Sequence, residues 1–199
     1  MASFNVQEFR AQMTGDGARP NLFNCSLPFL GNLLGDADVK YSFMCRAAQL
    51  PGSTVNQVPV NYFGRELKFA GNRTFTEWTV TIINDEDFVI RNAFELWMSR
   101  LNSHVSNLRD SNYINPSQYQ QDGIVTQYGK ADEVLKIYNF IGMFPIDISP
   151  IELDWGANDT IEEYAVTFAY QWWQSDTTDS NLSNGSPNVR PRRSNPVGA

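Results

Sequence analysis

Few residues of this chain have the types and spacing that catalysis requires. The single histidine, His104, follows an amphipathic helical pattern within a polar segment. An imidazole in that position more often stabilises a helix C-terminus than acts as the base of a nucleophilic triad. Asp85-Glu86-Asp87 and Glu162-Glu163 could support glycoside hydrolysis only if folding paired their carboxylates. Helix capping and alternation along a strand account for these acidic residues, so we predict no catalytic residue and no enzyme.

Metal and cofactor sites also lack the residues that they need. One histidine and two cysteines do not form a ligand cluster, and no acidic loop has the spacing of a calcium site. Gly15-Asp16-Gly17 lacks both the preceding strand and the following lysine of a phosphate-binding loop. We therefore predict no metal and no cofactor.

The two cysteines, Cys25 and Cys45, allow two interpretations. They would face each other if residues 22–30 and 39–47 formed a hairpin, and a disulfide could then join them. Thiols in a reducing cytoplasm stay free, and free cysteines pack as small apolar side chains. The second interpretation is favoured.

Length and composition favour one folded domain with a sizeable core. The chain has 199 residues, of which 42% are hydrophobic, 13% aromatic and 19% charged. Its net charge of −7 argues against proteins that hold nucleic-acid phosphates or anionic membranes, although nucleic acid could still pass by without being held. The absence of a membrane-length apolar run or a secretory N-terminus predicts synthesis in a cytoplasm, with no membrane anchor.

The fold is organised around a strand that leads directly into a helix. Alternation over residues 76–82 predicts a strand that buries Trp78, Val80 and Ile82. Asn84 can cap the helix that follows, and apolar residues at spacings of three and four give this helix one apolar face. We expect the helix to pack on the sheet through a core that comprises Trp78, Val80, Ile82, Phe94, Trp97 and Leu101.

Other period-2 runs predict further strands, separated by turn residues. These strands cover residues 21–30, 39–48, 62–70, 123–128, 134–144 and 161–173, with surface loops at 31–38 and 102–120 and a turn at 71–72. The expected fold is mainly β, a single-domain β-sandwich or small barrel with one flanking α-helix at about residues 85–102 and polar terminal arms. The arms are residues 1–20 and a polar tail, 174–199, around a domain at 21–173.

One segment between the predicted strands could make contacts with other molecules. Residues 50–60 contain two prolines and a glycine, which exclude a central strand and indicate a long loop or an edge excursion. The segment is apolar enough to bind a partner.

Several motifs resemble the tail tube proteins of contractile-tailed bacteriophages, the myophages. Their order and spacing match that family over residues 13–173, and the tail beyond Gln174 has no counterpart. The motifs are Ala18-Arg-Pro-Asn-Leu-Phe23, Ala48-Gln-Leu-Pro51, Gly71-Asn-Arg-Thr-Phe75, Trp78-Thr-Val-Thr81, Asn84-Asp-Glu86 and Leu153-Asp-Trp155.

The resemblance implies a structural protein of the virion tail, assembled in the cytoplasm of the host bacterium. Hexameric rings of such subunits stack into a hollow inner tube, within a contractile sheath, and phage DNA passes through the lumen into the host. The implied partners are other copies of the chain, the sheath protein, and the baseplate and tail-terminator proteins. The fold implied is similar to that of the type VI secretion tube protein, and an acidic lumen should repel DNA.

We hypothesise that residues 50–62 and the N-terminal arm form the contact between rings. The residues expected there are Phe4, Phe9, Arg19, Pro51, Val55, Val58, Pro59 and Tyr62. Ordinary surface loops are the alternative interpretation.

Two other classes of protein remain as alternatives. A monomeric β-sandwich could bind carbohydrate on Trp172 or Trp173, although alternation places one of them in the core and the other on the opposite face. An enzyme could use carboxylates that folding brings together. Concentration-dependent assembly would separate the tube protein from both.

Overall fold

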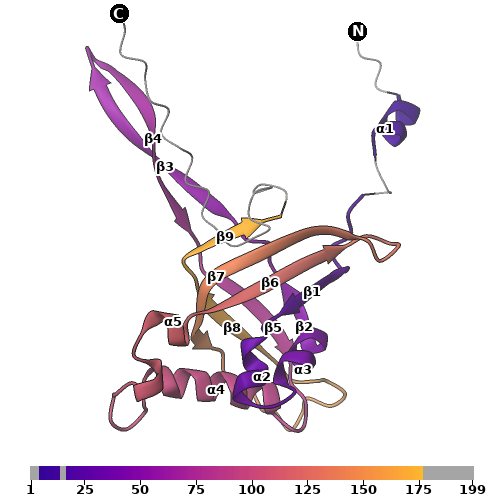
Figure 1. Ribbon diagram of the computed structural model, residues 1–199. Helices are drawn as coiled ribbons and strands as arrows, with labels where there is room; N and C mark the ends of the chain where they lie inside the picture. Colours follow the sequence, from indigo (N-terminus) through magenta and orange to yellow (C-terminus); the bar gives the residue numbers. More distant parts are fainter. Residues whose placement is uncertain (1–4, 14–16, 177–199) are drawn as a thin grey trace, which may run out of the picture.

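The computed structural model describes residues 5–13 and 17–176 (Figure 1). The fold is mainly β, as predicted, and all of its strand pairs are antiparallel. The larger sheet has the strand order β1 (Phe23–Ser26), β6 (Gln121–Tyr128), β7 (Val134–Ile148), β8 (Glu163–Ala169), β5 (Trp78–Ile83) and β2 (Cys45–Ala48), and β9 (Trp172–Ser175) also pairs with β7. The predicted tail beyond residue 176 lies outside the described residues.

Strand β7 joins the two halves of this sheet. Its first part pairs with β6 and β9, and its last part pairs with β8. The change of partner occurs near Gly142, which has a φ of +66°, and a Cβ there would lie 2.8 Å from Cγ of Gln171. Glycine therefore suits this bend. The strand does not end at Pro145 as predicted, because the proline lies at a β-bulge, where a missing N–H is tolerated.

A single hydrophobic core forms between the halves of the sheet and the helices. On β5 the side chains of Trp78, Val80 and Ile82 are buried, in the predicted alternation. Helix α4 (Val89–Leu101) buries Phe94 and Trp97, whereas Leu101 is partly buried at the edge of the core. The strand–helix unit expected from the sequence therefore positions the rest of the fold.

The start of α4 differs from the prediction. The N-cap is Phe88, in the left-handed conformation with a φ of +53°, and Asp87 Oδ1 accepts a hydrogen bond from the Val89 N–H at 3.1 Å. Asn84 does not cap the helix. Its side-chain amide instead donates to a Glu162 carboxylate oxygen at 2.8 Å, which ties the end of β5 to the segment that precedes β8.

An ammonium group also holds the start of α4. Lys40 Nζ lies 2.6 Å from Asp85 Oδ2 and pairs with Asp87 as well. Hydrogen bonds from Lys40 lower the pKa of both carboxyl groups and raise the pKa of the lysine. Because these groups are partly exposed, the cluster positions the helix start more than it stabilises the fold.

The predicted strand over residues 39–48 was wrong for most of its length. Residues Ala37–Met44 form helix α3, and only Cys45–Ala48 form a strand. The helix buries Ala37 and Tyr41, four residues apart, and leaves Phe43 79% exposed. A second helix, α2 (Phe29–Leu33), replaces the end of the predicted first strand and the start of the predicted loop at 31–38. The expectation of one flanking helix was therefore incomplete.

Two smaller predictions also need correction. The predicted loop over 102–120 contains a 3₁₀ turn (Ser111–Tyr113) and the short helix α5 (Pro116–Tyr119). The predicted strand over 161–173 is interrupted between β8 and β9, and β9 continues to the buried Ser175.

Both cysteines are free thiols, as the favoured interpretation of the sequence held. The expected hairpin does not form, since Cys25 lies on β1 and Cys45 begins β2. A hydrogen bond with Cys45 and burial raise the pKa of the Cys25 thiol, which suits a packed, unreactive side chain.

Replacement of a core aromatic residue should test this architecture. The fully buried Phe94 contacts the rings of Tyr41 and Phe168, so Phe94→Ala should lower the free energy of unfolding by about 3–5 kcal/mol. Urea denaturation of dilute, unassembled subunits measures this loss. The matched control is Phe43→Ala at an exposed position, which should change the free energy by less than about 0.5 kcal/mol. Equal losses in the two variants would contradict the assigned core.

Candidate assembly surfaces

A long hairpin extends from one end of the molecule (Figure 1). It consists of β3 (Ser53–Tyr62) and β4 (Arg65–Phe75), which form a separate two-stranded sheet. Every residue of β3 is exposed, and so are most residues of β4. The sequence correctly excluded a central strand here, but the predicted loop at 50–60 is one strand of this hairpin. A two-stranded hairpin without a covering layer is only marginally stable in water.

The turn of the hairpin lies at Phe63-Gly64, not at the predicted Gly71-Asn72. Both turn residues have positive φ, +47° and +80°, as tight hairpin turns require. Phe63 is 91% exposed at this tip, and its ring lies 4.4 Å from that of Tyr62. Gly71 lies at a β-bulge, where a Cβ would come within 2.9 Å of the Asn56 carbonyl oxygen.

The register gives the hairpin one apolar face. Val58 pairs with Phe69 and Val60 with Leu67, while the intervening Pro59 pairs with Lys68 and points to the other side. We call the apolar side, which carries a continuous row of half-exposed hydrophobic side chains, the apolar hairpin face. It comprises Val58 (50% exposed), Val60 (46%), Tyr62 (63%), Leu67 (43%) and Phe69 (56%).

Two indole groups anchor the chain that enters the hairpin. The Trp78 Nε1–H donates to the Gln49 carbonyl oxygen at 2.7 Å, and the Trp173 Nε1–H donates to the Gly52 carbonyl oxygen at 3.1 Å. At the far end of β4, the ring of Phe75 lies 6.1 Å from that of Tyr170. The base of the hairpin is therefore held to the body at three points, while the remainder projects freely.

The N-terminal arm contains a short, exposed helix. Helix α1 (Val6–Gln12) has Asn5 as its N-cap, whose side chain accepts a hydrogen bond from the Gln7 N–H at 3.0 Å. None of its residues is buried, and Val6 and Phe9 are 73% and 64% exposed. Such a helix of seven residues has little stability by itself. Its apolar side chains therefore suit contact with another surface.

The structure places the hypothesised contact residues in three regions. Val55, Val58, Pro59 and Tyr62 are exposed on β3, and Pro51 is partly buried at its base. Phe9 lies on α1 and Arg19 is exposed before β1, while Phe4 lies outside the described residues.

The sequence correctly predicted a strand over residues 62–70, which overlaps β4, but did not include its side chains in the contact surface. Leu67 and Phe69 repeat the period-2 pattern of Val58 and Val60 on the other side of Phe63-Gly64. This repeated pattern on both sides of the turn could have indicated that the two strands share one apolar face.

The described residues offer no evident site for a reaction. No three of their histidine, cysteine, aspartate and glutamate side chains come together as metal ligands. His104 is exposed in the loop after α4. Over the same residues, no helix combines the length and the apolar character needed to cross a membrane.

The chain is similar in sequence to tail tube proteins of phages. The family model described as phage tail tube protein matches residues 7–176. The chain is 34% identical over 166 residues to the tail tube protein gp19 of Enterobacteria phage T4. The matched region covers 83% of this chain and 96% of that protein. It is 27% identical over 169 residues to the tail tube protein of Serratia phage KSP90, covering 83% and 93% respectively.

Solved structures of contractile injection systems share the fold. A chain of the sheath-tube complex of an extracellular contractile injection system has a TM-score of 0.53 at 14% identity, covering 87% of this chain and 98% of that one. A chain of the tube-terminating cap of the anti-feeding prophage has a TM-score of 0.56 at 14% identity, covering 80% and 90%. At this identity the likeness concerns the fold alone.

Loss of the Trp173 hydrogen bond should loosen the hairpin without unfolding the body. Trp173→Phe keeps an aromatic ring but removes the donor to Gly52. Amides over residues 53–75 should then exchange with solvent hydrogen about fivefold faster, the effect of about 1 kcal/mol. Hydrogen-exchange mass spectrometry measures this, with Trp172→Phe, an indole 43% exposed, as the matched control. Equal hairpin exchange in the two variants would contradict the anchoring role.

Proposed function

The chain belongs to the phage tail tube protein family, and we propose from this premise that its copies form hexameric rings stacked into a hollow inner tube. The protein is a structural component of the virion tail and not an enzyme. The observation that carries the stacking proposal is the apolar hairpin face, which an isolated subunit leaves in contact with water. A monomer would gain nothing from such a surface, whereas a repeating contact would bury it.

Contact between rings is assigned to the hairpin and to α1. The hydrophobic side chains of the apolar hairpin face are between 43% and 63% exposed, and burial of each contributes favourably to association. The exposed Phe9 of α1 adds a further apolar side chain. A tube needs a contact between unlike surfaces that repeats along an axis, and a projecting element on each subunit provides one half of it.

Ring formation is assigned to the edges of the larger sheet. Strands β1 and β2 lie at the two ends of its strand order. Free strand edges promote uncontrolled aggregation, and pairing between neighbours in a closed ring removes them. Six-fold closure is part of the proposal and follows from the resemblance to the family.

The proposed partners are the other components of a contractile tail. A contractile sheath surrounds the tube, and baseplate and tail-terminator proteins meet its ends. The sheath-tube complex and the tube-terminating cap that share this fold support the proposal.

Passage of DNA fits the charge of the subunit. With a net charge of −7, many copies around a lumen repel phosphates, so DNA moves through without being held.

The alternative of a carbohydrate-binding module is weakened by the positions of the two tryptophans. The Trp173 indole is used within the protein, where it bonds to Gly52 and packs 5.7 Å from the Tyr138 ring. Trp172 alone is 43% exposed, which gives no broad stacking platform.

Neighbouring substitutions on the two sides of β3 test the stacking proposal. Val60→Asp places a charge on the apolar hairpin face and should leave folded subunits that no longer elongate, because the charge would have to be buried. Asn61→Asp places the same charge on the opposite side and should leave tubes intact. Negative-stain electron microscopy counts tubes, and circular dichroism checks folding. Tubes of normal length from Val60→Asp would refute the assigned contact. Loss of tubes in both variants would also refute it, because an added charge on either side of the hairpin would then be enough to prevent elongation.

Binding of DNA to assembled tubes tests the role of the lumen charge. Linear duplex DNA mixed with tubes at low ionic strength should stay in the supernatant after the tubes are pelleted, because repulsion is strongest there. A basic DNA-binding protein serves as the positive control for retention. Retention by the tubes that salt abolishes would contradict the proposal.

A further inference from the structure

A second exposed apolar surface lies on the segment that joins β7 to β8. Leu153, Trp155 and Ile161 on this segment are 80%, 102% and 71% exposed. We call residues 149–163 the acidic loop, because they include five acidic residues and no lysine or arginine. Figure 1 shows it at the end of the molecule opposite the hairpin. Exposed apolar side chains grouped in this way mark contact surfaces.

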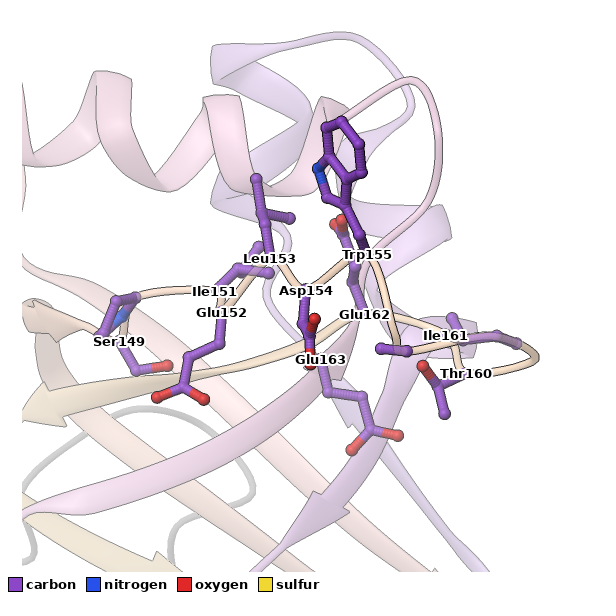
Figure 2. A pocket seen from close by; sticks show the side chains of 12 residues that line it. Ser149, Ile151, Glu152, Leu153, Asp154, Trp155, Thr160, Ile161, Glu162 and Glu163 are labelled. Carbon is purple, nitrogen blue, oxygen red and sulfur yellow. The ribbon is translucent and has the colours of Figure 1, made fainter.

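The acidic loop encloses a shallow pocket of about 590 Å³. Figure 2 shows that Glu152 and Glu163 point to the same side of the loop, whereas Trp155 projects from the other side. Arg46 pairs with Glu163, and Asn84 holds Glu162. Asp154 Oδ1 accepts a hydrogen bond from the Gly156 N–H at 2.9 Å, which shapes the turn beside Trp155. The loop therefore combines apolar side chains with negative charge.

The hairpin carries the opposite charge. Residues 53–75 include Arg65, Lys68 and Arg73 against the single acidic residue Glu66, in a chain that is acidic overall. Arg65 pairs with Tyr62 next to the tip, and Lys68 lies three residues farther along β4. The tip itself presents the 91% exposed ring of Phe63. The hairpin and the acidic loop therefore share an apolar character and carry opposite charges.

We propose that the acidic loop of one copy receives the hairpin tip of a second copy of this chain. The tip meets both sides of the loop: Phe63 and Tyr62 pack against Leu153, Trp155 and Ile161 on one side, and Arg65 and Lys68 lie near Glu152 and Asp154 on the other. This inference rests on the proposed stacking function and names its receiving surface. The two surfaces lie at opposite ends of one subunit, so the contact is head-to-tail and repeats along an axis.

Geometry and chemistry favour a second copy as the occupant. A strand advances about 3.4 Å per residue, so a strand of the length of β3, ten residues, reaches about 30 Å from its base. This reach takes the tip well beyond its own subunit. Aromatic side chains at the centre and charged pairs at the rim are the usual arrangement of a specific interface.

Charge reversal with reciprocal rescue is the main test. The Arg65→Glu/Lys68→Glu subunit should elongate poorly, and so should the Glu152→Lys/Asp154→Lys subunit, because each brings like charges together. A chain that carries all four substitutions should recover tubes. The control is Glu86→Lys, an exposed acidic residue outside the loop, which should elongate normally. Failure of the fourfold variant to recover, while each of its parts is folded, would overturn the proposal.

The aromatic contact has its own test. Trp155→Ser should raise the protein concentration needed for tube growth by about tenfold or more, the effect of losing a central aromatic residue. Val105→Ser, at a 97% exposed position in another loop, should not change it. Equal concentrations for Trp155→Ser and the unaltered protein would overturn the proposal.

A cross-linking experiment separates this inference from the stacking function itself. Subunits with Phe63→Cys are mixed with subunits with Leu153→Cys, assembled and oxidised, and disulfide-linked dimers are sought on a non-reducing gel. Dimers should form only in the mixture, and Val105→Cys in place of Leu153→Cys should give none. Normal tubes without cross-links would overturn the assigned receiving surface and leave stacking intact. Absence of rings and tubes from the unaltered protein would overturn both.

Discussion

The indole of Trp78 is the interaction on which the other parts of the molecule depend. It is 2% exposed, and its rings lie 4.4 Å from Phe140 and 5.7 Å from Phe168. These contacts join β5 to β7 and β8 in the centre of the core. The same indole donates its N–H to Gln49, in the segment that leads to the hairpin. One side chain thus stabilises the sheet and positions the hairpin, for which we propose contacts with other copies.

Aromatic contacts extend this support from the core to the base of the hairpin. The ring of Phe140 lies 5.0 Å from that of Tyr170, and Tyr170 contacts Phe75 at the end of β4. Trp173 holds the other strand through Gly52. Fixing the base while leaving the tip exposed lowers the conformational entropy lost on assembly. Part of the high aromatic content of the chain is therefore explained, because these aromatic side chains pack in the core and also hold the base of the hairpin.

The sequence was most informative where one pattern had one physical solution. Trp78, Val80 and Ile82 alternate over a clear strand, and α4 is long enough to show its period, so both were predicted. Tyr41, Phe43 and Cys45 also alternate as in a strand, so the sequence predicted a strand there. The segment instead forms α3, because a helix buries Ala37 and Tyr41 on one face. The second strand of the hairpin was predicted at residues 62–70, but its partner β3 was predicted as a loop because Pro51 and Pro59 argued against a regular strand. The acidic loop was not predicted as a contact surface, because exposure is a property of the folded chain. Motif resemblance identified the family, which no single residue could have done.

An exposed apolar hairpin is a risk to any protein that must wait before assembly, and its details limit that risk. Pro59 removes one backbone donor from β3, and the bulge between Val55 and Gln57 interrupts the regular ladder, so other strands pair poorly with this edge. Contacts must then be made through side chains, where shape and charge can select the partner. Because the hairpin is basic and the chain as a whole is acidic, most collisions between subunits are repulsive, and approach of the tip to the acidic loop is attractive. The charge distribution therefore opposes random association while favouring the head-to-tail contact that we propose between subunits.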